Sequence, residues 1–384
     1  MKNRIAVLAF LKTDAAGGVV LAICAVLALA IANSPLGPFY RALLSHALPL
    51  NLGGFAIHLT TEEWIKDGLM TLFFFVVGLE LKRELVEGEL SDLRAIVLPV
   101  AAALGGMVVP ALLYLLVGGH TDPRGWPVPV ATDIAFAVAA LAVFARSAPP
   151  SLRIFLLTLA IVDDLGAVVL IALLFSHDFA PALLLALALL LLALGLLGRL
   201  RRAPLWLWGI GALAVWALAL KSGIHTSVAG VAAAFTVPIG GGRLERLEKL
   251  LHPVSAYVVL PLFAMASAGI PFEGVSTSAL LSPLPLAIAL GLLPGKPLGV
   301  IGATYLVRLL GLARLPTGAN FMELSATACL CGIGFTMSLF LAALAFSGDP
   351  EAELLARLGV MLGSIAALGL GAVVFAMCGS NSRQ

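Results

Sequence analysis

Charged side chains are scarce in this sequence, at 11% of 384 residues, whereas an average soluble domain carries about 25%. Apolar residues make up 61% of the chain, and the mean hydropathy is +1.08. This composition excludes a soluble domain and indicates an all-α polytopic protein surrounded by a lipid bilayer. The net charge of +2 is spread between apolar runs with no basic stripe, so we expect no nucleic acid partner.

Cysteine is rare too, and the motifs of several enzyme classes are missing. Cys329 and Cys331 have no second Cys or His cluster with which to hold a metal, and Cys24 and Cys378 also lie in apolar runs, so we interpret all four as small buried hydrophobes. A Gly-x-Gly-Asp motif and a Gly-x-Ser-x-Gly context with an intramembrane His are both missing, which argues against intramembrane proteases. We therefore expect no enzyme and no cofactor.

Long apolar runs dominate the chain. Runs of roughly 18 to 25 residues are long enough to cross a bilayer. Counting them predicts about twelve spans in one transporter domain covering residues 1–384: 13–32, 60–81, 95–117, 127–145, 151–175, 180–198, 204–220, 223–239, 251–271, 284–307, 322–346 and 355–378.

The basic residues between these runs set the orientation. Of the 23 Lys and Arg residues, 17 fall on the face that carries both termini, and the positive-inside rule places that face in the cytoplasm. These 17 are Lys2, Arg4, Lys12, Lys82, Arg83, Arg94, Arg146, Arg153, Arg199, Arg201, Arg202, Arg243, Arg246, Lys249, Arg308, Arg314 and Arg383.

One segment outside the spans has a strand pattern. Residues 45–59 alternate on either side of Gly53 and Gly54, which predicts a β-hairpin. Because an isolated hairpin is marginal in water, it would pair with a second copy across a twofold axis or rest on a neighbouring loop. The sequence leaves both arrangements open.

Asp163 and Asp164 lie side by side within a predicted span. One intramembrane charge costs about 2.5 to 3.5 kcal/mol on insertion scales, so an adjacent pair indicates a functional site. Lys296, between Pro294 and Pro297 in another span, needs a counter-charge or helix C-terminal carbonyls. Since Lys296 is one intramembrane cation among several carboxylates, we predict that it pairs with Asp163.

Two spans contain helix-breaking residues. Pro127 and Pro129 disfavour helix just before Thr132 and Asp133, which can cap a new half-helix. Gly332 and Gly334 interrupt a second span, with hydroxyls from Thr336 and Ser338; close helix packing would also explain these glycines. The two breaks occupy the middle spans of 95–175 and 284–378, which predicts two inverted repeats with a binding site where they meet.

Several motifs in sequence carry a family resemblance. The chain resembles the NhaA family of bacterial sodium/proton antiporters, in order from about residue 10 to residue 375. The motifs are Phe74-Phe-Val-Val-Gly-Leu-Glu-Leu-Lys-Arg-Glu84, Ala131-Thr-Asp-Ile-Ala-Phe136, Ile161-Val-Asp-Asp-Leu-Gly166, Ser222-Gly-Ile-His225, Gly295-Lys-Pro-Leu-Gly299 and Gly332-Ile-Gly-Phe-Thr-Met-Ser338.

The resemblance implies an inner-membrane antiporter in which spans 4 and 11 unwind and cross at the midplane. It implies that Asp163 and Asp164 carry the cation and protons, with Thr132 and Asp133 beside them and Lys296 opposite. Sodium or lithium would leave the cell while a larger number of protons enters, so transport would be electrogenic.

The chemistry fits these residues. Sodium is a hard cation that takes oxygen ligands, and a carboxylate must lose its proton to hold it, so the two ions compete for one site. Asp133 would offset two helix N-termini and Lys296 two C-termini. On a helix Asp163 and Asp164 diverge by about 100°, and we predict that Asp164 faces sodium.

A second polar cluster lies at the predicted cytoplasmic mouth. Its members are interpreted either as an ordinary interfacial charge belt, which the residues alone favour, or, by the resemblance, as a pH-sensing region with a titrating histidine. They are Glu80, Arg83, Glu84, Glu248 and His252, and the chain has Lys249 where a well-studied relative has another histidine. Asp67 is either a headgroup-level charge or part of an access path.

A sodium-coupled symporter of a small solute is the alternative function, because it shares broken helices and inverted repeats. A symporter should also carry aromatic or Arg anchors for the solute, and the midplane motifs contain none.

Overall fold

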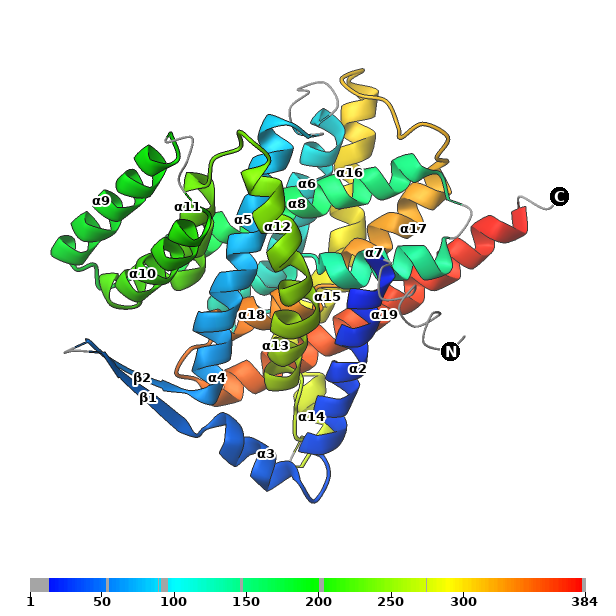
Figure 1. Cartoon of the computed structure of the whole chain (residues 1–384). Helices are drawn as coiled ribbons and strands as arrows, with labels where there is room; N and C mark the ends of the chain where they lie inside the picture. Colours follow the sequence, from blue (N-terminus) through cyan, green and yellow to red (C-terminus); the bar gives the residue numbers. More distant parts are fainter. Residues whose placement is uncertain are drawn as a thin grey trace, which may run out of the picture. The chain divides into compact units, whose positions relative to one another are not determined.

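The structure is a computed structural model that describes residues 14–52, 55–88, 90, 96–145, 148–199, 204–273 and 275–381. Helices account for most of these residues (Figure 1), as the apolar composition predicts. Basic residues of the charge bias that lie outside the described ranges are Lys2, Arg4, Lys12, Arg94, Arg146, Arg201, Arg202 and Arg383.

The chain divides into two compact units. The first comprises Met1–Val26, Asp92–Ala167 and Ile270–Gln384, so it holds most of both predicted repeats. Its elements are the start of α2 (Asp14–Ala32), α6 (Val97–Val117), η3 (Pro123–Gly125), η4 (Val128–Val130), α7 (Ile134–Phe144), most of α8 (Pro150–Leu174), α14 (Thr277–Leu280), α15 (Pro283–Leu290), η6 (Gly291–Gly295), α16 (Lys296–Leu309), α17 (Phe321–Cys331), α18 (Phe335–Ala345) and α19 (Pro350–Asn381).

The second unit comprises Leu27–Ser91 and Val168–Gly269. Its elements are α3 (Gly37–Leu44), β1 (Ala47–Leu52), β2 (Phe55–Thr60), α4 (Thr61–Glu63), η1 (Trp64–Leu69), α5 (Met70–Val86), α9 (Pro181–Leu197), α10 (Trp206–Ser222), α11 (Thr226–Thr236), α12 (Arg243–Val254), η5 (Ser255–Val259) and α13 (Leu260–Ser267).

The helices account for part of the predicted spans. Among the described residues, six helices are long and apolar enough to cross a bilayer, or eight if two bent pairs each form one span. The predicted spans at 180–198, 204–220 and 223–239 correspond to the shorter apolar helices α9, α10 and α11. The chain is thus a polytopic membrane protein, and the number twelve stays a prediction.

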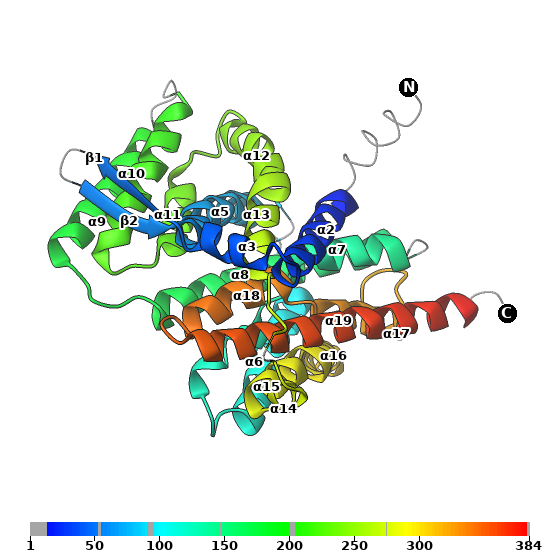
Figure 2. The same ribbon diagram turned by 90° about the horizontal axis from the view of Figure 1, so that it is seen from below.

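The predicted hairpin is present. β1 and β2 pair antiparallel with Leu48 opposite Leu59 and Leu50 opposite Ile57, and Figure 2 shows them as adjacent arrows. The indole nitrogen of Trp64 donates to the carbonyl of Leu48 at 3.0 Å, so the hairpin is tied to the helix that follows it. Gly53 and Gly54 lie outside the described residues. Leu48 and Leu50 are exposed, and contact with a second copy stays a prediction.

Two glycines bring α6 and α16 into backbone contact in the first unit. A Cβ on Gly299 would lie 2.1 Å from the carbonyl oxygen of Gly105, and one on Gly105 would lie 2.3 Å from that of Gly299. Nearby, a Cβ on Gly106 would lie 3.6 Å from Nζ of Lys296. The close crossing therefore sets where Lys296, the first residue of α16, can lie.

Replacing Gly299 by Ala should destabilise the protein by at least about 1 to 3 kcal/mol, because the added methyl collides with backbone that cannot rotate away. Thermal unfolding of the purified protein in detergent measures the loss. The matched control is Gly302→Ala on the same helix, where an added Cβ meets nothing within 4 Å. That control should be neutral or slightly stabilising, and equal losses in both variants would contradict the crossing argument.

Candidate functional site

The first interrupted span breaks just before Asp133. Pro127 and Pro129 supply no backbone donor, and the chain forms only the short turns η3 and η4 before becoming extended at Ala131. α7 then begins at Ile134, and Oδ1 of Asp133 accepts the amide hydrogen of Phe136 at 3.1 Å. Asp133 is therefore the N-cap of α7, as the sequence predicts.

The second interrupted span breaks at Gly332-Ile-Gly334, between α17 and α18. A Cβ on Gly332 would lie 2.4 Å from the carbonyl oxygen of Leu292, and one on Gly334 would lie 2.1 Å from Oγ of Ser338. Gly332 thus requires glycine because a backbone carbonyl approaches it directly, whereas at Gly334 the close neighbour is a side-chain hydroxyl. A sequence reading could not separate this cause from ordinary helix packing.

The two breaks meet. The amide of Asp133 donates to the carbonyl of Ile333 at 2.7 Å, and the hydroxyl of Thr132 lies 2.9 Å from the carbonyl of Cys331. Oδ2 of Asp133 accepts the amide hydrogen of Thr336 at 2.9 Å and also its hydroxyl. Asp133 therefore caps α18 as well as α7, placing one carboxylate at two partly positive helix N-termini.

Asp163 lies beside this meeting point on α8. Its Oδ2 accepts a hydrogen bond from the ammonium of Lys296, and the two side chains are completely buried. Oγ1 of Thr132 is 2.6 Å from the same oxygen. Oδ1 of Asp163 is buried with no hydrogen-bond partner among the described residues, so this oxygen remains available to a ligand or a proton.

The adjacent Asp164 is equally inaccessible, with 1% of its surface exposed. Direct contacts bring together the side chains of Asp163, Lys296, Thr132, Asp133 and Thr336. The polar contacts described for Lys296 do not include a helix C-terminus. Its role in offsetting two C-termini stays a prediction, as does the assignment of Asp164 to sodium.

This site combines carboxylate, hydroxyl and carbonyl oxygens with one ammonium. Such oxygens suit a hard cation, and the ammonium of Lys296 pairs with one of the carboxylates, that of Asp163. A proton or a cation arriving at Asp163 would compete with Lys296 for the same oxygen. The arrangement can therefore exchange one small cation for another.

The predicted mouth cluster lies in the second unit, between α5 and α12. Nε of Arg83 donates to Glu248 at 3.0 Å, and Nη1 of Arg83 is 2.7 Å from Glu84. Glu80 lies one turn before Glu84 on α5, and His252 on α12 is exposed. Lys82, one of the 17 basic residues assigned to the cytoplasmic face, donates instead to the carbonyls of Phe235 and Val237, both at 2.6 Å, at the C-terminal end of α11.

Asp67 lies in the second unit within the π-helical turn η1. Its backbone carbonyl accepts from Thr71 at 2.6 Å, Trp216 at 3.0 Å and Thr226 at 3.1 Å, and its carboxylate is 3.9 Å from Nε2 of His225. Sequence reasoning missed Trp216 and Thr226 because a carbonyl released by a π-helical turn leaves no signal in residue spacing.

Comparison with known proteins places the chain in a family. A family model described as Na+/H+ antiporter 1 matches residues 8–375. The chain belongs to this Na+/H+ antiporter family. Two relatives are named Na(+)/H(+) antiporter NhaA. The one from Haemophilus influenzae (strain PittGG) is 46% identical over 371 residues, which cover 94% of this chain and 92% of the relative. The one from Pasteurella multocida (strain Pm70) is 46% identical over 365 residues, which cover 92% of this chain and 96% of the relative. In this antiporter family member, the matched region contains all the residues of the site at the two breaks.

Proposed function

We propose that this chain is a sodium/proton antiporter of a bacterial membrane, exporting Na+ or Li+ in exchange for H+, with Asp163 and Asp164 as the carboxylates that bind either ion. The observation that carries the proposal is Asp163 itself, which is fully buried and held by Lys296 and Thr132 where the two broken helices meet. Family membership supports the same exchange.

Exchange follows from competition. With Asp163 ionised, Lys296 neutralises it; a sodium ion that binds the carboxylates and Thr132 displaces the ammonium, and protons reaching the same oxygens displace sodium. Asp133 and Thr336 hold the two half-helices together while this happens. If the site faces one side with sodium and the other with protons, no further device is needed for alternating access. Transport is electrogenic where more protons enter than sodium ions leave.

The proposal extends to the setting of the protein. It lies in the inner membrane as a multi-pass protein with both termini in the cytoplasm, and the hairpin at 45–59, whose first strand is exposed, joins two copies into a homodimer. It is a transporter and not an enzyme, and its partners are Na+, Li+, H+ and lipid. Asp67, with its network in the second unit, belongs to the access path.

Proteoliposomes with an imposed proton gradient test the exchange. We expect sodium to move opposite to protons with no added solute, and a voltage-sensitive dye to report net charge movement. Sodium moving with protons, or only when a small organic solute is present, would favour a sodium-coupled symporter and contradict antiport.

The hydroxyl of Thr132 should set cation affinity. Thr132→Val removes the group bonded to the Asp163 carboxylate, and hydrogen bonds to charged groups contribute about 1.5 to 3 kcal/mol, so KM for Na+ should rise roughly 10-fold to 100-fold. The matched control, Thr132→Ser, keeps the hydroxyl and should stay close to wild type. The dependence of flux on sodium concentration measures both variants, and an unchanged KM in Thr132→Val would count against the role.

The mouth cluster around Arg83 supplies the pH regulation of this proposal, through Glu80, Glu84, Glu248 and His252. Its ion pairs link α5 to α12, and a titrating group there changes the charge balance of that link. A flux-against-pH curve that is flat from about 6 to 8.5, the window that brackets an ordinary histidine pKa, would contradict the sensor role.

A further inference from the structure

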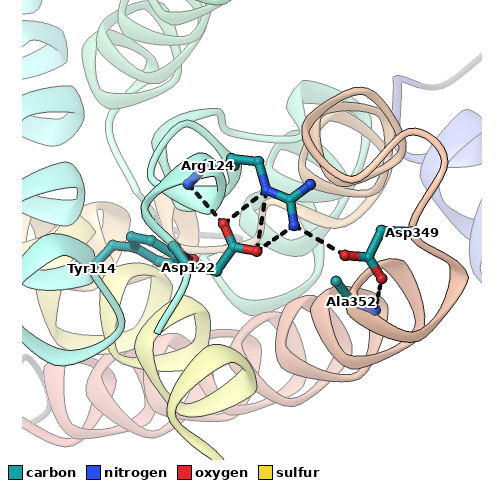
Figure 3. Close-up of polar contacts among 5 residues, drawn as sticks. All are labelled: Tyr114, Asp122, Arg124, Asp349 and Ala352. Atoms are coloured by element: carbon teal, nitrogen blue, oxygen red, sulfur yellow. Dashed lines mark hydrogen bonds and ion pairs between the residues drawn. The ribbon is translucent and has the colours of Figure 1, made fainter. Parts of the chain in front are cut away.

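A cluster of side chains outside the cation site joins the loop after α6 to the α18–α19 turn. We call it the clamp, and its members are Tyr114, Asp122, Arg124, Phe346 and Asp349. Arg124 is at its centre (Figure 3): its Nε lies 3.0 and 3.2 Å from the two carboxylate oxygens of Asp122, and its Nη2 lies 2.6 Å from Asp122 and 3.0 Å from Asp349. One guanidinium therefore bridges two carboxylates that lie 227 residues apart in sequence.

The clamp is fixed at both ends by packing and by backbone contacts. The hydroxyl of Tyr114, a fully buried side chain, donates to the backbone carbonyl of Asp122 at 2.7 Å. Asp349 accepts the amide hydrogen of Ala352 at 3.2 Å at the start of α19, and the guanidinium of Arg124 lies 5.4 Å from the centre of the Phe346 ring. Arg124 is therefore oriented by a hydrogen-bond fork and an aromatic face, a combination that lysine cannot reproduce.

The two carboxyls of the clamp stay ionised well below neutrality. Hydrogen bonds from Arg124 hold the pKa of Asp122 below its usual range. The amide of Ala352 and then Arg124 do the same to the pKa of Asp349. A lowered pKa in the folded state means that the contribution of each carboxylate is present above the ordinary carboxyl pKa and is lost on acidification below it. The clamp therefore holds throughout the neutral and alkaline range.

The segments that the clamp joins lead directly to the cation site. From Arg124 the chain runs through the short turns η3 and η4 to Thr132 and Asp133. From Phe346 it runs back along α18 to Thr336. The two segments are joined again at their other ends, where Asp133 accepts from Thr336 and donates to Ile333. The clamp and the Asp133 contacts thus close a ring of two segments tied at both ends.

The first segment depends on this ring for its position. A continuous helix fixes its residues through its own hydrogen bonds, but the stretch with Pro127 and Pro129 has only short turns. Thr132 is therefore held by the packing of the buried residues Val128, Pro129 and Val130 and by the contacts at the two ends of its segment.

We propose that Arg124 is a positioning residue for the cation site: by joining Asp122 to Asp349 it fixes the far ends of the two broken segments, and so the placement of Thr132 and Asp133. This inference rests on the proposed antiport. The ion pairs themselves are partly exposed, with 50% of the Arg124 side chain and 39% of the Asp349 side chain accessible, so their direct contribution to global stability is small. The expected effect is on the geometry of the cation ligands.

Three variants test the clamp through the KM for sodium. Asp349→Asn removes the negative charge that pairs with Arg124, yet the Asn side chain can still accept the amide hydrogen of Ala352 as an N-cap. Arg124→Gln removes the ion pairs with both Asp122 and Asp349. Arg124→Lys keeps the positive charge but lacks the planar guanidinium that bonds to two carboxylates at once. We expect KM for Na+ to rise about 3-fold to 10-fold in Asp349→Asn and Arg124→Gln. The Na+/Li+ preference should change in both variants, whereas the maximal rate per inserted molecule should stay nearly unchanged. The KM of Arg124→Lys should lie between that of wild type and that of Arg124→Gln.

The matched control is Glu353→Gln. It breaks the ion pair between Glu353 and Arg357, two residues one turn apart within α19. This control should leave KM and the ion preference unchanged. A purely structural role for Arg124 would lower the amount of inserted protein and leave KM as it is.

The outcomes separate the two proposals. If wild type shows no sodium/proton exchange, the proposed function fails. If wild type exchanges and Asp349→Asn keeps the wild-type KM and Na+/Li+ preference, the clamp proposal is overturned. Should Arg124→Gln fail to insert, Asp349→Asn decides alone, supported by the sodium-induced shift in thermal unfolding, which should need more sodium in the variant than in wild type.

Discussion

Sodium/proton exchange is expected to fall at least roughly 100-fold when Asp164 is replaced by Asn, because the neutral amide can neither release a proton nor offer sodium a charged oxygen. The protein itself should stay folded, since the pair between Asp163 and Lys296 remains in place. Flux in proteoliposomes and thermal unfolding in detergent, both recorded with and without sodium, measure the two effects separately.

The sharpest part of this prediction is the loss of sodium-dependent stabilisation. A ligand that binds the folded state raises its stability in proportion to the logarithm of ligand concentration. Wild type should therefore unfold at a higher temperature as sodium increases, whereas Asp164→Asn should not respond. Asp163→Asn is the companion variant, because it leaves Lys296 buried without its partner and should lower stability even without sodium. If sodium stabilised Asp164→Asn as much as it stabilises wild type, the cation would be bound by other ligands.

Much of the site's geometry could be predicted from local sequence. The capping of α7 by Asp133 follows from two prolines and a Thr-Asp pair within seven residues. The contact between Asp163 and Lys296, which the structure contains, follows from charge balance, because an isolated ammonium in an apolar span needs a nearby anion. Both arguments use short-range rules or a strong energetic penalty. The roles of these residues in transport stay predictions.

Other features depend on tertiary contacts that no sequence period encodes. Asp133 can cap two helices only because the start of α18 lies beside the first break. Gly332 is a site of close approach only because the carbonyl of Leu292 lies against it. Arg124 resembles an ordinary loop charge until Asp349 is brought beside it. α11 covers only 11 residues of the predicted span 223–239, because Gly223, with a φ of +89°, ends α10 and turns the chain, and α11 begins only at Thr226.

Replacing Lys296 by Met should destabilise the protein by about 3 to 5 kcal/mol, because it removes one partner of a completely buried ion pair and leaves the other uncompensated. Met fills nearly the same volume, so the loss reports charge and not a cavity. Thermal unfolding in detergent at constant ionic strength measures it. The control is Lys221→Met, a change at an exposed lysine outside the site, which should have little effect.

The double variant, Asp163→Asn with Lys296→Met, then separates folding from transport. Replacing a buried ion pair by neutral groups of similar size is often close to neutral for stability, so the double variant should recover most of what Lys296→Met loses. It should not recover wild-type proton coupling, because neither position can exchange a proton for sodium any longer. Restored stability with a changed number of protons per sodium ion would place this pair in the coupling step. Wild-type coupling in the double variant would instead make the pair structural and assign proton transport to Asp164.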